Sequence, residues 1–269
     1  MSPAIAQAFA AARQEGRAAF IPFLSGGLPD MATSARLLLE LDQAGADIIE
    51  VGIPFSDPMA DGPVIQQASK QALDAGATPV GVLELIAGLQ GRLRAPVVVM
   101  TYYNPVLNLG LEAFARQAAA AGVAGAIVPD LPPEEASPWL TAARAAGLDT
   151  IFMAAPTTPA QRLPAILGCC SGFLYYVSMT GVTGGGLSLD PEMLAGIARV
   201  RQAASLPVAV GFGVAEPAQA AALGRVADGV IVGSALVKLV LGAGSPDQAQ
   251  AAVRGLAGEL SAALAGGGR

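Results

Sequence analysis

The sequence predicts an α/β protein that folds as one (β/α)8 TIM barrel, a single domain over residues 1–269. Eight short apolar runs alternate with helical patterns from one end of the chain to the other, which is the element order of a parallel barrel. The runs carry consecutive Val and Ile residues instead of strict apolar–polar alternation, as expected for strands that are covered on both faces. The length of 269 residues suits one barrel of this kind.

The expected elements follow one another in strand–helix order. The strands are Ala19–Leu24, Asp47–Val51, Val97–Thr101, Gly125–Val128, Asp149–Met153, Phe173–Val177, Pro207–Val210 and Gly229–Val232. Between them lie amphipathic or Ala-rich segments, which include Thr33–Ala44, Leu111–Ala121, Glu134–Ala146, Pro191–Ala203 and Pro217–Leu223. An extra amphipathic segment, Ile5–Gln14, precedes the first strand, and we expect this N-terminal helix to plug the bottom of the barrel.

Two connections are longer than the usual strand-to-helix turn. One follows the second strand and runs through Gly62, and the other follows the sixth strand and runs from Ser178 to Asp190. Both leave the carboxyl ends of strands, the face on which barrel enzymes carry their sites. Long loops at this face are usually functional lids, so both are candidate functional segments.

Composition and charge exclude several classes of protein. Charged residues make up 13% of the chain, the net charge is −6 and no basic run occurs, which argues against a nucleic acid partner. The uncharged span Leu163–Leu189 is broken by several glycines, so it does not have the pattern of a membrane helix. The chain opens without a secretory pattern, and its two cysteines, Cys169 and Cys170, are adjacent. We therefore expect a reduced, soluble, cytoplasmic protein without a metal site.

Missing residue types narrow the possible chemistry further. The sequence contains no His, which removes Ser-His-Asp triads, His-ligated metals and imidazole acid–base catalysis. The two lysines, Lys70 and Lys238, fall in helical segments, whereas a Schiff-base lysine would be expected at a strand end. Proton transfer must then fall mainly to Asp, Glu, Tyr or Cys side chains.

The most informative stretch joins the second strand to the long loop behind it, over Glu50–Gln66. Glu50 interrupts the apolar run Ile48–Val51, where the pattern predicts another apolar residue. Burying a charge is costly unless the charge is paired or used, so Glu50 is a candidate catalytic residue. Asp57 and Asp61 follow in the loop, beside Pro and Gly, where a purely turn-forming role would also suit them.

This stretch closely resembles the signature of the tryptophan synthase alpha chain family, and the resemblance covers nearly the whole chain, including Tyr175–Ser178 followed by Gly181–Gly184. It implies that Glu50 and Asp61 are the two catalytic carboxylates. It also implies retro-aldol cleavage of indole-3-glycerol phosphate to indole and D-glyceraldehyde 3-phosphate, with Glu50 as the acid–base residue and Asp61 bound to the indole N–H. The segment Gly185–Ser188 departs from many members, which carry a more polar and less flexible lid there.

The resemblance also implies a partner. Members of the family act beside a pyridoxal-phosphate-dependent beta chain in an α2β2 heterotetramer and pass indole to it for tryptophan synthesis. No cofactor is expected in this chain itself. Thr183 is expected in a lid over the site, and Pro54, Phe55, Asp57 and Pro58 are expected at the interface with the beta chain.

Glycines follow both of the last two strands. Gly211 and Gly213 follow the seventh strand, and Gly233 and Ser234 follow the eighth. Backbone N–H groups at such turns, and at a helix start, approach a phosphate closely, and these two strand ends form the usual phosphate site of barrels. We expect these residues to bind a phosphate, and the resemblance adds Gly184, which reaches it from the lid.

A further set of apolar and aromatic residues lies at or just beyond strand ends. On pattern alone they fit a barrel core, whereas the resemblance places several of them around an indole ring, for which an apolar pocket is suitable. They are Phe23, Met100, Tyr102, Ile127, Pro129, Met153, Tyr175 and Phe212. The tyrosine of the family that matches Tyr175 lies near the catalytic Glu. Asp130 fits either a turn cap or a partner surface.

Two other functions compete with this one. A phosphate-binding barrel isomerase would share the fold and the phosphate site, but such enzymes lack the Pro-Phe-Ser-Asp-Pro loop that links the two acids. An indole sensor, or an inactive scaffold for a beta chain, would not need both Glu50 and Asp61. An assay for indole release from indole-3-glycerol phosphate separates the three.

Overall fold

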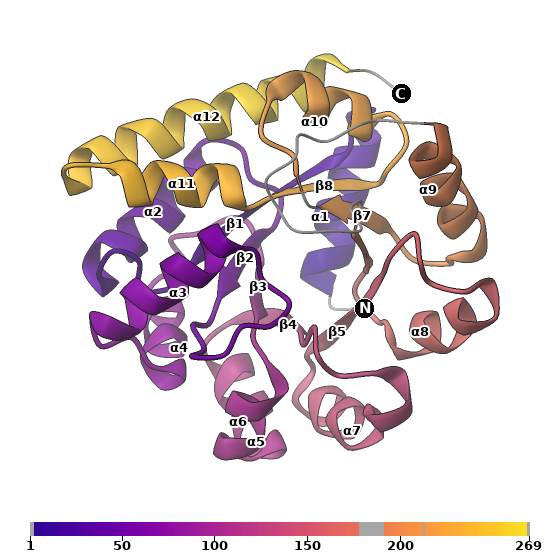
Figure 1. The fold of residues 1–269 in the computed structure, drawn as a ribbon, viewed down its shortest axis with the longest axis horizontal. Helices are drawn as coiled ribbons and strands as arrows, with labels where there is room; N and C mark the ends of the chain where they lie inside the picture. Colours follow the sequence, from indigo (N-terminus) through magenta and orange to yellow (C-terminus); the bar gives the residue numbers. More distant parts are fainter. Residues whose placement is uncertain (1–2, 178–190, 212, 268–269) are drawn as a thin grey trace.

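The computed structural model describes residues 3–177, 191–211 and 213–267, and its strands close into a parallel barrel (Figure 1). The strands are β1 Ala19–Ser25, β2 Ile49–Gly52, β3 Val97–Met100, β4 Val123–Ile127, β5 Asp149–Ala154, β6 Leu174–Val177, β7 Val208–Gly211 and β8 Gly229–Val232. They follow each other around the barrel in sequence order, and β1 pairs with both β2 and β8. The predicted (β/α)8 barrel is confirmed.

Helices surround the barrel on its outside, except for the N-terminal helix, which lies behind the strands (Figure 1). The α-helices are α1 Pro3–Gln14, α2 Met31–Gln43, α3 Pro63–Asp74, α4 Pro79–Ala87, α5 Tyr103–Leu109, α6 Leu111–Ala120, α7 Ser137–Ala146, α8 Leu163–Cys169, α9 Pro191–Ala203, α10 Pro217–Gly224, α11 Ser234–Gly242 and α12 Pro246–Gly266. Two short 3₁₀ helices, η1 Pro133–Glu135 and η2 Ala160–Arg162, precede α7 and α8. The loop after β2 ends where α3 begins, at Pro63, as predicted.

The N-terminal helix closes one end of the barrel. Ile5, Phe9 and Ala12 of α1 are buried and pack in one cluster with residues from all around the barrel. The ring of Phe9 lies 5.6 Å from the ring of Phe173, just before β6. Because α1 lies behind the strands in Figure 1, at the ends where they begin, the expected plug at the bottom is present.

Some element boundaries differ from those that the sequence predicts. β2 begins at Ile49 and not at Asp47. The carboxylate of Asp47 accepts two hydrogen bonds from Arg17, at 2.6 and 2.9 Å, and one from the backbone N–H of Phe20, at 2.7 Å. These bonds hold Asp47 in the turn that precedes the strand. α4, α5 and α12 fall outside the helices listed from the sequence. α4 and α5 have 9 and 7 residues, too few for a clear helical period, whereas α12, with 21 residues, was missed despite its length.

The acidic residues at the bottom of the barrel are paired. Asp42 bonds the Arg94 side chain at 3.2 Å and the Arg94 backbone N–H at 3.0 Å. Asp228, just before β8, bonds the Arg201 side chain at 3.1 Å and the backbone N–H of Val208 at 3.0 Å. A carboxylate with a charged partner and a backbone donor is well compensated for partial burial. These acids therefore join elements of the fold.

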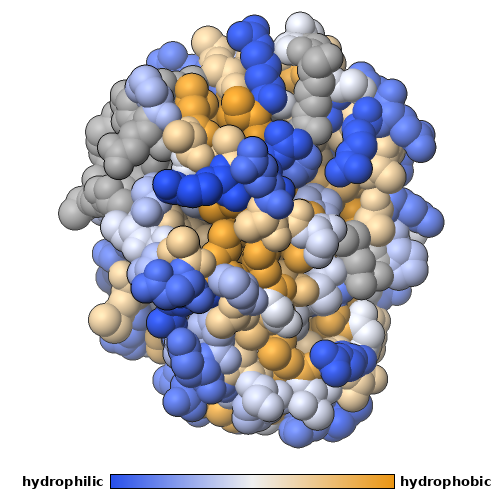
Figure 2. Space-filling view, turned by 90° about the vertical axis from the view of Figure 1, so that its right-hand side faces the viewer, coloured by the Kyte–Doolittle hydropathy of each residue, from blue (hydrophilic) through white to orange (hydrophobic). Residues whose placement is uncertain are grey.

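The outer surface mixes apolar and polar side chains. Figure 2 shows the face that carries α8 and α9, where apolar side chains lie between hydrophilic ones. Among the large apolar side chains that the structure describes, Met59 in the loop after β2 is 92% exposed and Leu107 of α5 is 50% exposed. Over the described parts of the chain, no helix has both the length and the apolar content needed to cross a membrane.

Candidate active site

Glu50 lies on β2 and is almost completely buried. It pairs with Phe23 of β1 and Val98 of β3, and only 1% of its surface is exposed. Its Oε2 atom has no hydrogen-bond partner among the described residues. Burial, and to a smaller extent the nearby charge of Asp61, raises the pKa of Glu50 to about 8. A carboxyl group in this position is protonated at neutral pH and can donate a proton.

Asp61 reaches the same site from the loop after β2. Its backbone N–H donates to the carbonyl of Pro58 at 3.1 Å, and Gln66 Nε2 donates to its carbonyl at 2.9 Å. Its carboxylate accepts a hydrogen bond from the hydroxyl of Tyr102. Burial raises the pKa of Asp61 to about 6, and the hydrogen bond from Tyr102 opposes this rise. At pH 7 Asp61 is therefore mainly ionised while Glu50 is mainly protonated.

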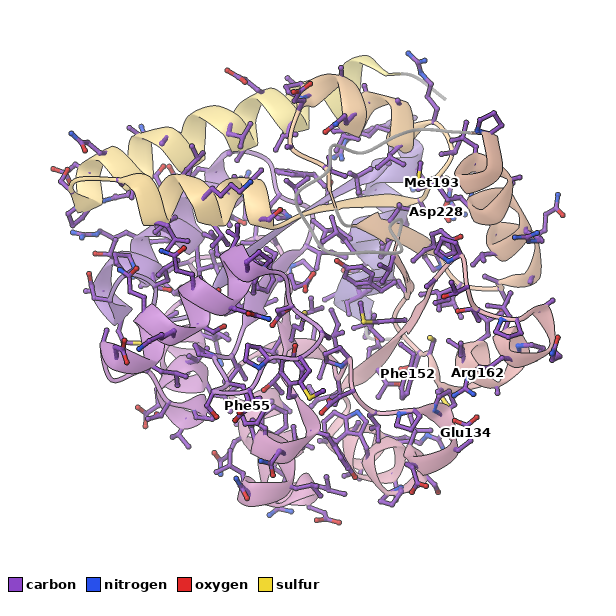
Figure 3. The ribbon with its side chains drawn as sticks, in the orientation of Figure 1. Phe55, Glu134, Phe152, Arg162, Met193 and Asp228 are labelled. Atoms are coloured by element: carbon purple, nitrogen blue, oxygen red, sulfur yellow. The ribbon has the colours of Figure 1, made fainter. Side chains whose placement is uncertain are left out.

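Tyr102, just beyond β3, holds the loop in place. Its hydroxyl oxygen accepts a hydrogen bond from the backbone N–H of Ala60 at 2.9 Å. Its ring packs on Phe55, with centroids 5.4 Å apart and planes inclined by 33°, and Figure 3 shows Phe55 on the side of the barrel toward α5 and α6. Burial and the charge of Asp61 raise the pKa of Tyr102, so the hydroxyl remains a donor to Asp61.

Tyr175 faces both carboxyl groups from β6, across the barrel from β2. Burial raises its pKa well above the ordinary value, and the charges of Glu50 and Asp61 add to this effect. Gly211 at the end of β7 leaves room for the ring, since a Cβ at this position would lie 2.8 Å from Cζ of Tyr175. The site thus brings Glu50, Asp61 and Tyr175 together, from β2, its loop and β6.

A pocket opens beside these groups, at the carboxyl ends of β1, β2 and β3. It is lined by Phe23, Ser25, Gly52, Ile53, Phe55, Asp61, Ile65, Ser69, Met100 and Tyr102. Three residues expected around an indole ring, Phe23, Met100 and Tyr102, are in this lining. Ser25 and Ile65 were not predicted as site residues, although the two-residue period of a strand places position 25 on the same side of β1 as position 23.

The other residues expected around the ring lie further around the barrel. Ile127 of β4 is fully buried in the cluster that includes α1, and Met153 of β5 packs against that cluster. Pro129 is half-buried after β4. Asp130 accepts a hydrogen bond from the backbone N–H of Tyr103 at 2.8 Å, so it serves as a cap for the first turn of α5.

The expected phosphate residues of the last two strands lie at glycine turns. α11 begins at Ser234, and Gly233 before it makes no side-chain cap, so the N–H groups of the first turn are available to an anion. Gly213 has a φ of 80°, which favours glycine. A Cβ on Gly233 would lie 3.2 Å from the ring of Phe23, so this turn borders the pocket.

The residues expected in the lid and at a partner interface are only partly described. Asp57 is exposed, whereas Pro54 is buried within the chain. Thr183 and Gly184, and also Phe212 of the expected ring pocket, lie outside the described residues.

This arrangement combines the buried, protonated carboxyl of Glu50 with the ionised carboxylate of Asp61 in the pocket wall. Two carboxyl groups whose surroundings give them different pKa values provide a proton donor and a charge-stabilising acceptor at the same pH. Across the residues described, no group of three or more His, Cys, Asp or Glu side chains has the arrangement of a metal site. The fold and the site define a barrel built for acid–base chemistry at the carboxyl ends of its strands.

Comparisons with known proteins identify the family. The sequence model described as "Tryptophan synthase alpha chain" matches residues 9–265. The tryptophan synthase alpha chain of a Caulobacter species is 52% identical over 230 residues, which are 85% of this chain and 84% of the relative. That of a Picosynechococcus species is 46% identical over 262 residues, 97% of this chain and 99% of the relative.

Solved structures agree with the sequence comparison. A tryptophan synthase of Mycobacterium tuberculosis superposes with a TM-score of 0.88 at 42% identity, covering 97% of each chain. Tryptophan synthase subunit alpha of Legionella pneumophila gives a TM-score of 0.89 at 35% identity, covering 97% of this chain and 98% of that one. The chain belongs to the tryptophan synthase alpha chain family, whose name places it among the lyases of tryptophan biosynthesis and implies a beta-chain partner.

Proposed function

We propose that the chain cleaves indole-3-glycerol phosphate to indole and D-glyceraldehyde 3-phosphate, with Glu50 and Asp61 as its catalytic residues. The observation that carries the proposal is the carboxyl pair itself. Glu50, with a pKa raised to about 8, and Asp61, with a pKa raised to about 6, interact electrostatically and differ in protonation state at pH 7. The family to which the chain belongs supports the same assignment.

Glu50 serves as acid and then as base. In its protonated form it donates a proton to C3 of the indole ring, which turns the ring into an electron-accepting indolenine. The bond between C3 and the hydroxyl-bearing carbon then breaks, and its electron pair returns to the ring. The hydroxyl proton passes to the carboxylate of Glu50 as the aldehyde forms, so Glu50 recovers its starting protonation state.

Asp61 stabilises the charge that develops during this step. Its carboxylate accepts a hydrogen bond from the indole N–H, which becomes more acidic when C3 is protonated. The hydrogen bond from Tyr102 lowers the pKa of Asp61 and so favours the ionised form that this role requires. Phe23 and Met100 of the pocket lining would contact the faces of the ring.

The phosphate is bound by backbone groups. No Lys or Arg follows β7 or β8 directly, where the sequence runs Gly211–Glu216 and Gly233–Ala235. The N–H groups at Gly213 and at the start of α11 would hold the dianion, with Gly184 added from the lid. Thr183 would belong to the same lid, which excludes water from the reacting groups.

The chain works with a beta chain in this proposal. The partner carries pyridoxal phosphate, receives the indole and forms an α2β2 heterotetramer with this chain. The alpha chain itself folds as one domain, has no cofactor of its own and acts in the cytoplasm. Asp57 and Phe55 on the loop after β2 are the proposed contact residues, with Pro54 behind them in the chain interior.

The test is a spectroscopic assay for indole release from indole-3-glycerol phosphate. We expect Glu50→Gln to bind substrate and to lose about 10²-fold or more of the cleavage rate, because the amide keeps the shape but cannot transfer the proton. Asp57→Asn, which alters an exposed carboxylate of the same loop, is the matched control for intrinsic turnover. Turnover of Glu50→Gln within a few-fold of wild type would remove Glu50 from the mechanism. A wild-type chain that binds indole but does not form it from indole-3-glycerol phosphate would favour a sensor or scaffold.

A further inference from the structure

Three buried side-chain oxygens have no hydrogen-bond partner among the residues that the structure describes. They are Oε2 of Glu50, Oγ of Ser25 and Oγ1 of Thr101. A buried hydroxyl without a partner is destabilising, since it loses its hydrogen bonds to water and gains none. Glu50 is accounted for by the acid–base chemistry, and the two hydroxyls are not.

Ser25 belongs to the pocket and Thr101 does not. Ser25 is 2% exposed and contributes to the pocket wall, together with Asp61 and Tyr102. Thr101 is 1% exposed and stands between two lining residues, Met100 and Tyr102, without lining the pocket. Of these two residues, only Ser25 therefore adjoins the space that a ligand would fill.

The strand register places Ser25 beyond Glu50 along the barrel axis. Phe23 pairs with Glu50 and Ser25 pairs with Gly52, so Ser25 lies one step nearer to the carboxyl ends of the strands. Gly52 has no side chain that could bond the hydroxyl of Ser25. The two unpartnered oxygens, of Glu50 and Ser25, thus lie diagonally across neighbouring strands, where a single ligand with two adjacent hydroxyl groups could bond both.

The position of β1 sets which part of a ligand would meet Ser25. β1 lies between β2, which carries Glu50, and β8, which leads into the turn at Gly233 and Ser234. A substrate whose reacting carbon is at Glu50 and whose phosphate is at this turn must pass across the end of β1. In indole-3-glycerol phosphate, the carbon that makes this crossing carries a second hydroxyl.

We propose that the Ser25 hydroxyl bonds this second hydroxyl, which stays on the aldehyde product, and so positions the three-carbon chain between Glu50 and the phosphate turn. The inference rests on the proposed function and adds a residue to it. Ser25 is in this view a substrate-positioning residue that distinguishes a hydroxylated three-carbon chain from one without the hydroxyl.

The experiment measures condensation, the reverse reaction, in which C3 of indole adds to the aldehyde carbon. Wild type, Ser25→Ala, Ser25→Thr and Thr101→Val would each be assayed by loss of indole fluorescence with two aldehydes. One is D-glyceraldehyde 3-phosphate, and the other is 3-hydroxypropanal phosphate, which lacks the hydroxyl. Thr101→Val is the matched control, because it also removes a buried unpartnered hydroxyl, but one outside the pocket.

We expect Ser25→Ala to lower kcat/KM for D-glyceraldehyde 3-phosphate by about three- to tenfold, the effect of one neutral hydrogen bond. For 3-hydroxypropanal phosphate, kcat/KM should stay within about twofold of wild type. Ser25→Thr should retain the wild-type preference, and Thr101→Val should affect both aldehydes equally. Equal losses with both aldehydes in Ser25→Ala, or no loss with either, would overturn the inference alone. Absence of condensation by the wild-type chain would overturn the proposed function, and the inference with it.

Discussion

Replacing Glu50 by Gln should stabilise the fold at high pH while it removes activity. The carboxyl group is buried, and its pKa is raised from 4.5 to about 8, so the folded state retains a proton that the unfolded chain loses. Because the folded state binds more protons over this interval, the free energy of unfolding falls as pH rises. The stabilising contribution of protonated Glu50 is complete below pH ~4.5 and is lost by pH ~8.

The size of this effect follows from the two pKa values. Each unit of difference corresponds to about 1.4 kcal/mol, so the interval from 4.5 to about 8 amounts to roughly 5 kcal/mol in total. A large part of it, about 3 kcal/mol, is already lost at pH 7. Gln at position 50 cannot ionise, so the free energy of unfolding of this variant does not contain this pH-dependent contribution.

Urea unfolding of wild type and Glu50→Gln at pH 5, 7 and 8.5 measures the effect. The difference in the free energy of unfolding between the two proteins should move in favour of Gln by about 4 kcal/mol from pH 5 to pH 8.5. Taking this difference cancels the contributions of titrating groups that do not interact with Glu50, whereas Asp61 and Tyr175, which are coupled to its charge, contribute to the shift. Asp57→Asn, at an exposed site, should follow wild type at each pH. If the free energy of unfolding depended on pH in the same way for wild type and Glu50→Gln, the conclusion that Glu50 is buried and protonated would be refuted.

Three further predictions concern activity. The value of kcat/KM should fall below pH ~6 as Asp61 gains a proton and above pH ~8 as Glu50 loses one. Tyr102→Phe should move only the acidic limb of this profile, to higher pH; an unmoved limb in that variant would show that Tyr102 does not lower the pKa of Asp61. Gly213→Asp should weaken glyceraldehyde phosphate binding more than Gly213→Ala does, since both strain the backbone and only Asp adds a negative charge. Calorimetric titration measures this affinity, and an equal loss of affinity in the two variants would place the phosphate elsewhere. A purified beta chain should raise the rate of indole formation about tenfold or more, and Thr183→Val should reduce that gain; an isolated chain at full speed would contradict this coupling.

The barrel and its acid pair could be predicted because each leaves a local signal. Continuous apolar runs and their spacing predict parallel strands covered on both faces, and β1 to β8 follow that order. Glu50 stands out because it is a charge in an apolar run. Asp47 occurs in the same run, and only the structure shows that its carboxylate is held by Arg17 outside the strand.

The contacts that tune the site could not be predicted, since they join distant parts of the chain. Tyr102 bonds the backbone of Ala60, 42 residues away, and this pairing depends on the path of an irregular loop. Ser25 was not predicted as a site residue because serine before Gly-Gly is an ordinary turn residue, although the strand period places it on the same side of β1 as Phe23. Its burial and the absence of a partner among the described residues become visible only once the strands are in register.

The paired acids at the bottom of the barrel and the unpaired one at its mouth have different evolutionary constraints. Loss of Arg17 or Arg94 would leave Asp47 or Asp42 without its charged partner and reduce the stability of the fold in any lineage, whatever it catalyses. Glu50 gives the opposite case, because its removal relieves an electrostatic cost and is opposed only by loss of turnover. A lineage that no longer needed the reaction should therefore lose Glu50 quickly and keep the bottom pairs, so a decaying copy of this gene could be recognised by that order of loss.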